Sequence, residues 1–424
     1  MAGGAGLGSG PAPAPGLPLA GQGGPAPLPG GGLAGPGPGR PAGPVRGRGR
    51  ALGAALAALL AAAAWAWPAG AAPPTVPPHA VVLLYHHFGD PRHPSTNVDL
   101  GLFEAQLDWL EREGFQVWPL ERILEALEEA TKGGPGDGEP LPDRVVAITV
   151  DDAYRSVATE AFPRLRARGW PFTVFVATDG VDRGYRALMD WATMRRLARA
   201  GVRFANHSAS HGHLLARRPG EDEAAWRARV RADILRAQRR LAEELGEAQG
   251  PPPALFAYPY GEYDPALAEL VAGLGLTAFG QQSGALGPWS DPRALPRFPM
   301  AGPYAALESF RTKVLSLPLP VQAQRPWSPV TAEARPRLEL VLDAAGVRRH
   351  GVRLAGLRCY ASGQGPIPVR WLGRAPPRLE TRATAALPPG RSRYNCTAPS
   401  PWPGRWFWFS HPWLRPGPGG GGAR

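Results

Sequence analysis

The stretch Val145-Val-Ala-Ile-Thr-Val-Asp151-Asp152-Ala-Tyr154 decides the fold class. Its first six residues are apolar apart from Thr149, which predicts a strand buried on both faces. The strand ends in two adjacent carboxylates, whose side chains point to different sides of an extended backbone. Paired acids at the carboxyl end of a buried strand are typical of an α/β active site. A helix N-cap is the alternative, because Asp favours that position and a helical pattern follows.

Strands of this kind alternate with helices along most of the chain. The expected strands are 80–85, 115–118, 145–150, 172–176, 202–205, 254–257 and 277–280. The expected helices are 103–113, 120–129, 157–168, 190–200, 221–247 and 265–274. Such alternation predicts parallel β-α units, enough of them to curl into a barrel over residues 79–318.

The pattern changes after about residue 320. Short strands are expected at 338–342, 352–360, 367–372, 379–383, 393–397 and 406–409, between Gly and Pro turns and without helical periodicity. Residues 325–415 are therefore predicted to form a small all-β, sandwich-like domain. Its tryptophans suit sugar stacking, but the alternation of Trp406 and Trp408 with Phe407 and Phe409 places most of them in the core. A carbohydrate-binding domain and an inert packing domain both remain open.

The chain has two cysteines, Cys359 and Cys396, both in this second domain. In an exported protein an isolated pair is most simply a disulfide, and the alternative is two buried free thiols. Closing a loop of that length would stabilise the fold by ~3–4 kcal/mol in the chain-entropy model.

The amino-terminal segment has the pattern of an export signal. Residues 1–44 are rich in Gly, Pro and Ala and cannot form a core, so we expect them to be disordered or a gene-start artefact. Residues 45–72 combine a basic segment, an apolar run over 51–67 and small residues, as a signal peptide does. If this leader stays uncleaved, residues 51–67 would contact the membrane. We expect a bacterial protein exported to the periplasm or the medium, with a disordered tail over 416–424.

The net charge of +12 does not by itself indicate a nucleic-acid partner. Arginines spread along the chain carry almost all of the positive charge, and the only lysines are Lys132 and Lys313. No RNA- or DNA-binding motif accompanies them, so we expect no nucleic-acid binding.

Histidines suggest a metal site. His207 and His211 are spaced i, i+4, as chelation on one helical turn requires, and His213 is a third candidate. With Asp152 they would form a two-His, one-carboxylate site with open positions. The expected ion is divalent, with zinc first and nickel, cobalt or iron as alternatives.

The order of these pieces resembles the polysaccharide deacetylases of carbohydrate esterase family 4. Three motifs carry the resemblance over residues 80–300: Thr149-Val-Asp151-Asp152, His207-Ser208-x-x-His211 and Tyr258-Pro259-Tyr260-Gly261. Trp191 falls where relatives often carry a tryptophan, and Tyr154 follows the first motif. The resemblance implies a distorted (β/α) barrel that removes acetyl groups from a polysaccharide.

The resemblance also implies roles for the matching residues. Asp151 would be the general base, while Asp152, His207 and His211 hold the metal. The backbone N–H of Tyr260 would help to form the oxyanion hole. Ser208 would hold the loop, and we expect Tyr154, Trp191 and Pro259 to support the loops or the substrate.

No histidine follows the third motif to act as the family's usual acid. In the branch that deacetylates β-1,6-linked poly-N-acetylglucosamine, the last strand is permuted to the amino terminus with a Tyr-His element. Tyr85-His86 fits this arrangement, so His86 is assigned as the acid, with His87 as the alternative.

Two positions depart from the family pattern. Ala153 replaces a usual Gly, and its methyl group is expected to narrow the site. Ala257 stands where an arginine commonly partners the base, and Arg297 is a candidate replacement against the alternative of a surface arginine. We expect an N-deacetylase acting on an N-acetylglucosamine polymer of the cell envelope or biofilm matrix. The alternatives are a deacetylase of peptidoglycan or chitin oligomers and a non-catalytic carbohydrate-binding protein.

Overall fold

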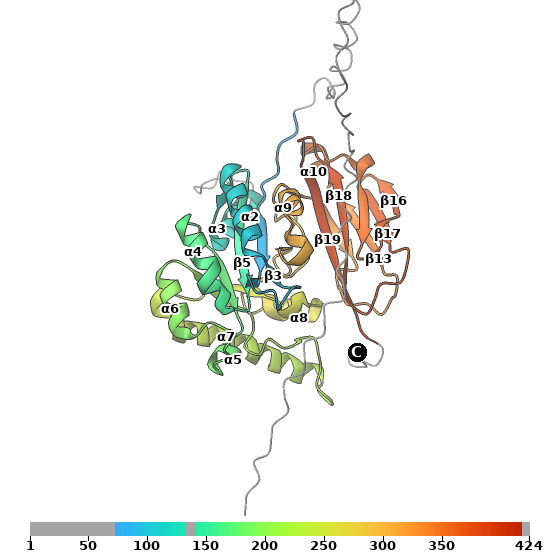
Figure 1. Cartoon of the computed structure of the whole chain (residues 1–424). Helices are drawn as coiled ribbons and strands as arrows, with labels where there is room; N and C mark the ends of the chain where they lie inside the picture. The colour runs from blue at the N-terminus through green and yellow to red at the C-terminus, as the bar shows by residue number, and fades with distance from the viewer. Residues whose placement is uncertain (1–72, 133–140, 418–424) are drawn as a thin grey trace, which may run out of the picture.

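The computed structural model describes residues 73–132 and 141–417, so the expectations for residues 1–72 and 418–424 lie outside it. The chain forms a mixed α/β domain and, beside it, a β-rich domain built from the last quarter of the sequence (Figure 1). Within the described ranges, no helix combines the length and the apolar character needed to cross a bilayer.

A parallel sheet of eight strands is the centre of the first domain. Its strands are β1 (Val81–Tyr85), β4 (Gln116–Val117), β5 (Val145–Asp151), β6 (Thr173–Val176), β7 (Arg203–Asn206), β8 (Leu255–Ala257), β9 (Thr277–Phe279) and β10 (Phe298–Pro299). The order is β10-β1-β5-β6-β7-β8-β9, with β4 paired to the start of β5. A single bridge from Phe279 to Leu295 connects β9 back toward β10. Among the described residues, β9 and β10 are not joined by continuous strand pairing, so the sheet curls without closing completely. This confirms the distorted barrel.

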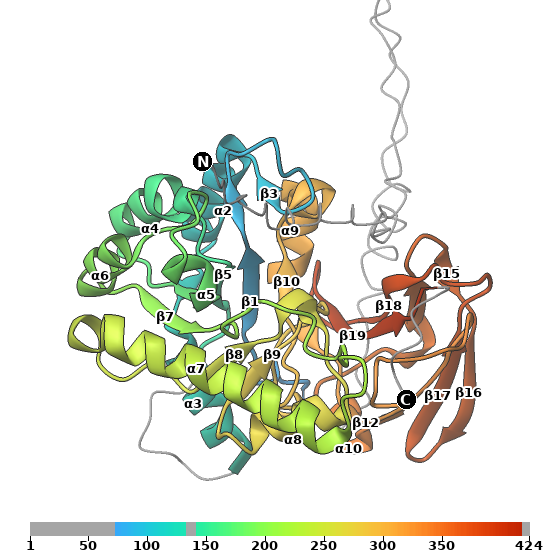
Figure 2. The same ribbon diagram turned by 90° about the horizontal axis from the view of Figure 1, so that it is seen from below.

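Helices surround this sheet, as the two perpendicular views show (Figures 1 and 2). They are α2 (Leu100–Arg112), α3 (Leu120–Lys132), α4 (Phe162–Ala167), α5 (Thr178–Asp182), α6 (Trp191–Arg199), α7 (Glu223–Gln249), α8 (Pro265–Ala272) and α9 (Leu307–Val314). The helix expected at 157–168 begins instead as a π-helical turn, η1 (Val157–Ala161). Two short strands, β2 (His87–Phe88) and β3 (Asn97–Val98), pair at the carboxyl end of β1.

The second domain consists of two sheets that share one apolar core. One sheet has the order β11-β19-β18-β14-β15 and the other β12-β13-β17-β16. The strands are β11 (Leu317–Pro318), β12 (Val321–Arg325), β13 (Arg337–Leu342), β14 (Arg358–Ala361), β15 (Gly365–Ile367), β16 (Val369–Arg374), β17 (Pro377–Arg382), β18 (Gly390–Pro399) and β19 (Trp406–Arg415). A disulfide joins Cys359 to Cys396 across directly opposed positions of β14 and β18.

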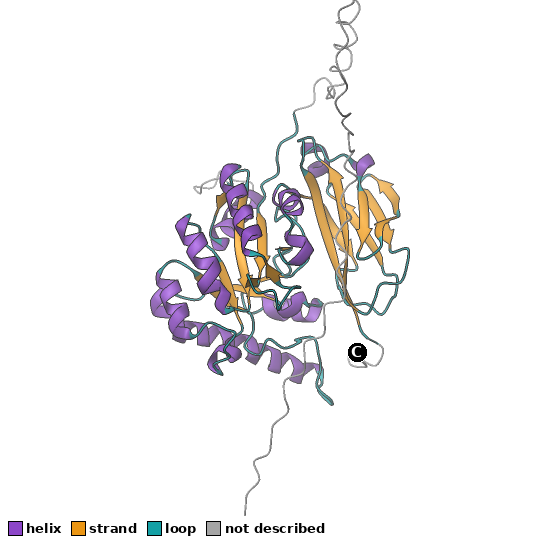
Figure 3. Cartoon of the chain, in the orientation of Figure 1, coloured by secondary structure: helices purple, strands orange, loops and turns teal. Residues whose placement is uncertain are grey.

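Two expectations for this domain are wrong. Helix α10 (Ala344–Arg349) interrupts the strands, capped by Asp343, whose carboxylate accepts from the N–H of Ala345. The strand expected at 352–360 begins as a 3-10 turn, η4 (Leu354–Gly356), and only β14 is extended. Both pieces are only one or two turns long, too short for a helical period to stand out. Most helices nevertheless lie in the first domain (Figure 3).

Strand β19 lies between the two domains. The ring of Phe407 is fully buried in the core of the sandwich, whereas Trp408 packs edge-on against Phe298 of β10 with ring centroids 5.3 Å apart. Trp408 belongs to the core of the first domain. The alternating aromatic residues of β19 therefore bury one face against each domain, and neither Phe407 nor Trp408 is free to stack on a sugar.

The substitution Trp408→Ala tests this shared packing. Removing a 7%-exposed indole should lower the free energy of unfolding by about 3–5 kcal/mol, because the cavity cannot collapse between two domains. The matched control Trp371→Ala removes an indole that is 38% exposed and should change it by about 0.5 kcal/mol or less. Denaturant titration measures both. Equal effects would show that β19 does not join the domains.

Candidate active site

The candidate site lies at the carboxyl ends of β5, β7 and β8, which share one edge because the strands are parallel. Each strand turns sharply there. Asp152 after β5, Ser208 and His211 after β7, and Tyr260 after β8 have φ of 73°, 63°, 52° and 60°. Left-handed backbone is costly for residues other than Gly and concentrates at functional sites. These turns bring all three sequence motifs to one place.

Three potential ligand atoms converge at this edge. Oδ1 of Asp152 lies 3.5 Å from Nε2 of His207 and 3.0 Å from Nε2 of His211. One ligand atom from each residue lies within 4.8 Å of the others. Nδ1 of His207 donates to the carbonyl of Ala257 (2.7 Å), which leaves its Nε2 lone pair for an ion. The donor set therefore fits a divalent metal such as zinc.

His213, the third candidate, lies outside this cluster. Its Nδ1–H donates to Glu262 (2.8 Å), and its ring stacks on Tyr260 with centroids 4.2 Å apart. His207 and His211 rather than the nearby His213 face Asp152, but they do so from an irregular loop and not from the helical turn that their spacing predicted.

Asp151 is held by a buried arginine. Arg297 forms a bidentate ion pair with its two carboxylate oxygens at 2.7 and 2.8 Å, and both side chains are fully buried. The alternative of a surface arginine is wrong. Burial alone would raise the pKa of Asp151, but Arg297 and His207 outweigh it and hold the pKa below its usual value. Asp151 thus stays a carboxylate although it is out of water.

Asp152 and His211 influence each other in the same way. Burial opposes the ionisation of Asp152, but His211 and His207 hold its pKa well below the usual value. Burial also opposes charge on His211, yet Asp152 raises the pKa of that imidazole. Each charge favours the other, so an ion that binds here must displace the proton of His211.

Ala153 does not narrow the site. It is fully buried in the core of the first domain and is not among the residues that line the cleft. The left-handed turn at Asp152 and Ala153, with φ of 73° and 55°, explains the error, because it carries the methyl group away from the cleft.

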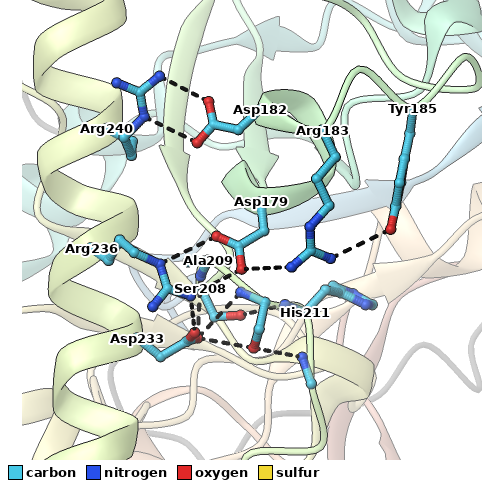
Figure 4. A network of polar contacts seen from close by, with 12 residues as sticks. Asp179, Asp182, Arg183, Tyr185, Ser208, Ala209, His211, Asp233, Arg236 and Arg240 are labelled. Carbon is cyan, nitrogen blue, oxygen red and sulfur yellow. Dashed lines mark hydrogen bonds and ion pairs between the residues drawn. The ribbon is translucent and has the colours of Figure 1, made fainter. Parts of the chain in front are cut away.

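A polar network fixes the loop that carries the two histidines (Figure 4). Within the loop, Oγ of Ser208 accepts from the N–H of His211 (3.0 Å). From helix α7, Oδ2 of Asp233 accepts from the N–H of Ala209 (3.2 Å) and from the hydroxyl of Ser210 (3.2 Å). Asp233 did not come from any sequence motif. The sequence feature that could have identified it is a carboxylate on the apolar face of α7, one residue before the buried Ile234.

The network extends to helix α5. Arg236 donates to both oxygens of Asp179 (3.2 and 3.0 Å) and to Oδ1 of Asp233 (2.8 Å). Trp191, which was expected to support the loops or the substrate, is not among the residues that line the cleft. Its indole N–H donates to Asp182 (2.8 Å), next to Arg240.

His86 and His87 occupy different surroundings. His86 lines the cleft, and burial lowers its pKa although Asp152 and Asp151 oppose this. The ring of His87 stacks between Tyr154 and His93, with centroids 3.6 and 4.3 Å away, and is absent from the residues that line the cleft. Burial and His93 lower the pKa of His87 to about 4. The geometry favours His86 as the residue that meets a substrate.

The site opens into a cleft of 660 Å³. Asp152, His207, His211 and Tyr260 lie in its wall together with Tyr154 and His86. Pro259 is buried at the start of the turn η2 (Pro259–Gly261) that presents Tyr260. Residues 391–393 and 412–414 of the second domain also line the cleft, which sequence reasoning missed.

Comparison with known proteins agrees with these motifs. Residues 138–279 match the model of the polysaccharide deacetylase family, so the chain contains a domain of that family. The poly-beta-1,6-N-acetyl-D-glucosamine N-deacetylase of Escherichia coli K12 is 28% identical over 256 residues, which are 52% of this chain and 36% of that protein. The chain thus spans little more than a third of that relative.

Solved structures give weaker similarity. The deacetylase PplD of Streptococcus pyogenes, in complex with acetate, is 20% identical with a TM-score of 0.48 and covers 56% of this chain and 99% of its own. IcaB from Ammonifex degensii is 24% identical with a TM-score of 0.43, covering 55% and 95%.

Asp233→Asn tests whether α7 positions the histidine loop. An amide has one acceptor oxygen, so it must turn its NH₂ group toward either Arg236 or the loop donors. We expect the affinity for zinc to fall by about tenfold or more, as for other outer partners of metal ligands. Glu247→Gln, an exposed change on the same helix, is the control. Metal titration of both purified proteins decides, and unchanged affinity in Asp233→Asn would contradict the positioning role.

Proposed function

We propose that this chain, which contains a domain of the polysaccharide deacetylase family, is a metal-dependent N-deacetylase of an N-acetylglucosamine polysaccharide. The observation that carries the proposal is the cluster of Asp152, His207 and His211 in the wall of the cleft, with the buried Asp151–Arg297 pair next to it. Asp151 does not itself line the cleft, but its Oδ2 lies 3.9 Å from Nε2 of His207. A protein that only binds sugar has no need of a second carboxylate kept ionised next to a metal-ligand set.

The three ligands would hold zinc or a similar divalent ion. When bound, such an ion supplies Lewis acidity toward a carbonyl oxygen and makes a strong nucleophile available at neutral pH. His207 and His211 contribute neutral imidazoles and Asp152 the carboxylate. The hydrogen bond from His207 to the carbonyl of Ala257 keeps the correct nitrogen free for this purpose.

The remaining residues would move protons and stabilise charge. Asp151, kept ionised by Arg297, accepts the proton of the attacking water as general base. The backbone N–H of Tyr260 donates to the oxygen of the acetamide as negative charge develops on it. His86 donates a proton to the departing amine. Base and acid thus come from different strand ends, β5 and β1.

The preferred substrate is a β-1,6-linked N-acetylglucosamine polymer, because Tyr85-His86 at the amino-terminal strand fits that branch and the E. coli relative bears that name. Peptidoglycan and chitin oligomers are the alternatives. The basic, apolar and small-residue pattern of residues 45–72 supports export, which would give the enzyme access to such a polymer.

Acetate release tests the proposal. The zinc-loaded protein is incubated with β-1,6-linked and β-1,4-linked N-acetylglucosamine oligomers and with peptidoglycan fragments, and acetate is quantified. We expect release from at least one substrate and its loss after Asp151→Asn or chelation. No release from any substrate, with the metal demonstrably bound, would favour a carbohydrate-binding protein instead.

His86→Ala tests the assignment of the acid. Removing the general acid should lower kcat by about 10²–10⁴-fold while zinc binding persists. His87→Phe keeps an aromatic ring against Tyr154 and should lower kcat by less than about tenfold, since His87 does not line the cleft. A larger loss in His87→Phe than in His86→Ala would reverse the assignment.

A further inference from the structure

The second domain supplies part of the cleft wall. Strand β18 contributes Arg391, Ser392 and Arg393, and the end of β19 contributes Trp413 and Leu414. These residues line the same cleft as the candidate metal ligands. A domain that only packed against the barrel would not need charged side chains on this surface.

Arg391 reaches the third motif directly. Its Nη1 donates to the carbonyl of Tyr260 (2.8 Å), and its guanidinium lies 5.5 Å from the centroid of the Tyr260 ring. This contact uses one arm of a fork that can bind a carboxylate with two parallel hydrogen bonds. Arg391 lines the cleft and has no ion-pair partner in the described parts of the chain.

Arg393 is more deeply placed. It is only 8% exposed, and its Nη1 donates to Ser283 (3.3 Å). Its Nε is buried and makes no hydrogen bond of good geometry. The hydroxyl of Tyr304 is also buried, and the ring centroid of this tyrosine lies 5.3 Å from the guanidinium. Burial lowers the pKa of Arg393 although Tyr304 opposes the shift, as expected of a cation taken out of water beside a polar group and without a carboxylate.

The part of the cleft lined by the second domain is positively charged. Among the residues that line it, the only carboxylate is Asp152, which belongs to the candidate metal site. Neither Arg391 nor Arg393 forms an ion pair within residues 73–132 and 141–417, whereas Arg297, the other buried arginine of the site, is paired with Asp151. Behind the wall, burial and Arg393 lower the pKa of Lys313 to about 7. A partly desolvated cation without a counter-charge is expensive to keep unless an anion arrives to pair with it.

We propose that Arg391 and Arg393 form a subsite for a carboxylate carried by the polysaccharide, so that the chain acts on an acidic polymer in which N-acetylglucosamine neighbours a carboxylate-bearing sugar. The inference rests on the proposed function for the deacetylation itself. Among the substrates named there it favours peptidoglycan over the β-1,6-linked homopolymer and chitin oligomers, which carry no carboxylate, and it adds polymers that contain a uronic acid. Uronic acids and the lactyl ether of muramic acid both present this group. Ser283 and the carbonyl of Tyr260 orient the two guanidinium groups for it.

Binding to the metal-free full chain tests the subsite independently of turnover. The probes are a hexasaccharide of alternating N-acetylglucosamine and glucuronic acid and a tetrasaccharide of N-acetylglucosamine and N-acetylmuramic acid. Each is compared with its own carboxyl-reduced form, which differs only in charge. We expect at least one acidic probe to bind about tenfold or more tightly than its reduced form, as charge-assisted pairs with arginine require. The probe that shows the preference identifies the source of the carboxylate.

Three substitutions sharpen the test. Arg391→Gln and Arg393→Gln should each reduce the preference for the acidic probe to about threefold or less. Arg374→Gln makes the same change of charge on an exposed position of β16, outside the cleft, and should keep the preference. If Arg393→Gln fails to fold, the Arg391→Gln variant, at a partly exposed position, still tests the subsite by the same binding measurement. Equal binding of acidic and reduced probes, or equal loss in Arg374→Gln, would overturn the proposal. A preserved preference without acetate release would refute only the deacetylase activity.

Discussion

The common edge of the parallel sheet is the constraint on which the site depends. Strands β5, β7 and β8 end at the same level, so three turns that are spread along the sequence from Asp152 to Tyr260 come together. Each turn contains at least one residue other than glycine in the left-handed region. The packing of the sheet and the network of Asp233 hold these conformations, which place Asp152, His207 and His211 around one small volume.

The second constraint is electrostatic. Asp151 would be costly in a fully buried position, because a carboxylate out of water needs a partner. Ala257, at the end of β8, stands where relatives commonly carry the arginine that pairs with the base. In this chain Arg297 reaches the carboxylate instead, from the segment before β10. The same interaction is thus achieved from another part of the chain. Arg297 thus keeps Asp151 charged, and the backbone carbonyl of Ala257 accepts the hydrogen bond of His207.

Features with a local signal could be predicted, and those that depend on distant contacts could not. The apolar runs of β1 and β5, the periodic helices α6 and α7, and the three motifs are local patterns. Helix α10 is too short for its period to stand out, and β10 has two residues. The roles of Asp233, Arg391 and Arg393 arise from tertiary contacts with loops far along the chain. The second domain was therefore predicted only as a separate small domain, although it forms part of the cleft wall.

Direct observation of the ion tests the central claim. Crystals of the full chain grown with zinc would be measured at the zinc absorption edge, and anomalous density would locate the metal. The account predicts one strong peak at about 2.0–2.2 Å from Nε2 of His207, Nε2 of His211 and a carboxylate oxygen of Asp152. A peak elsewhere, or none at this edge of the sheet at saturating zinc, would contradict it.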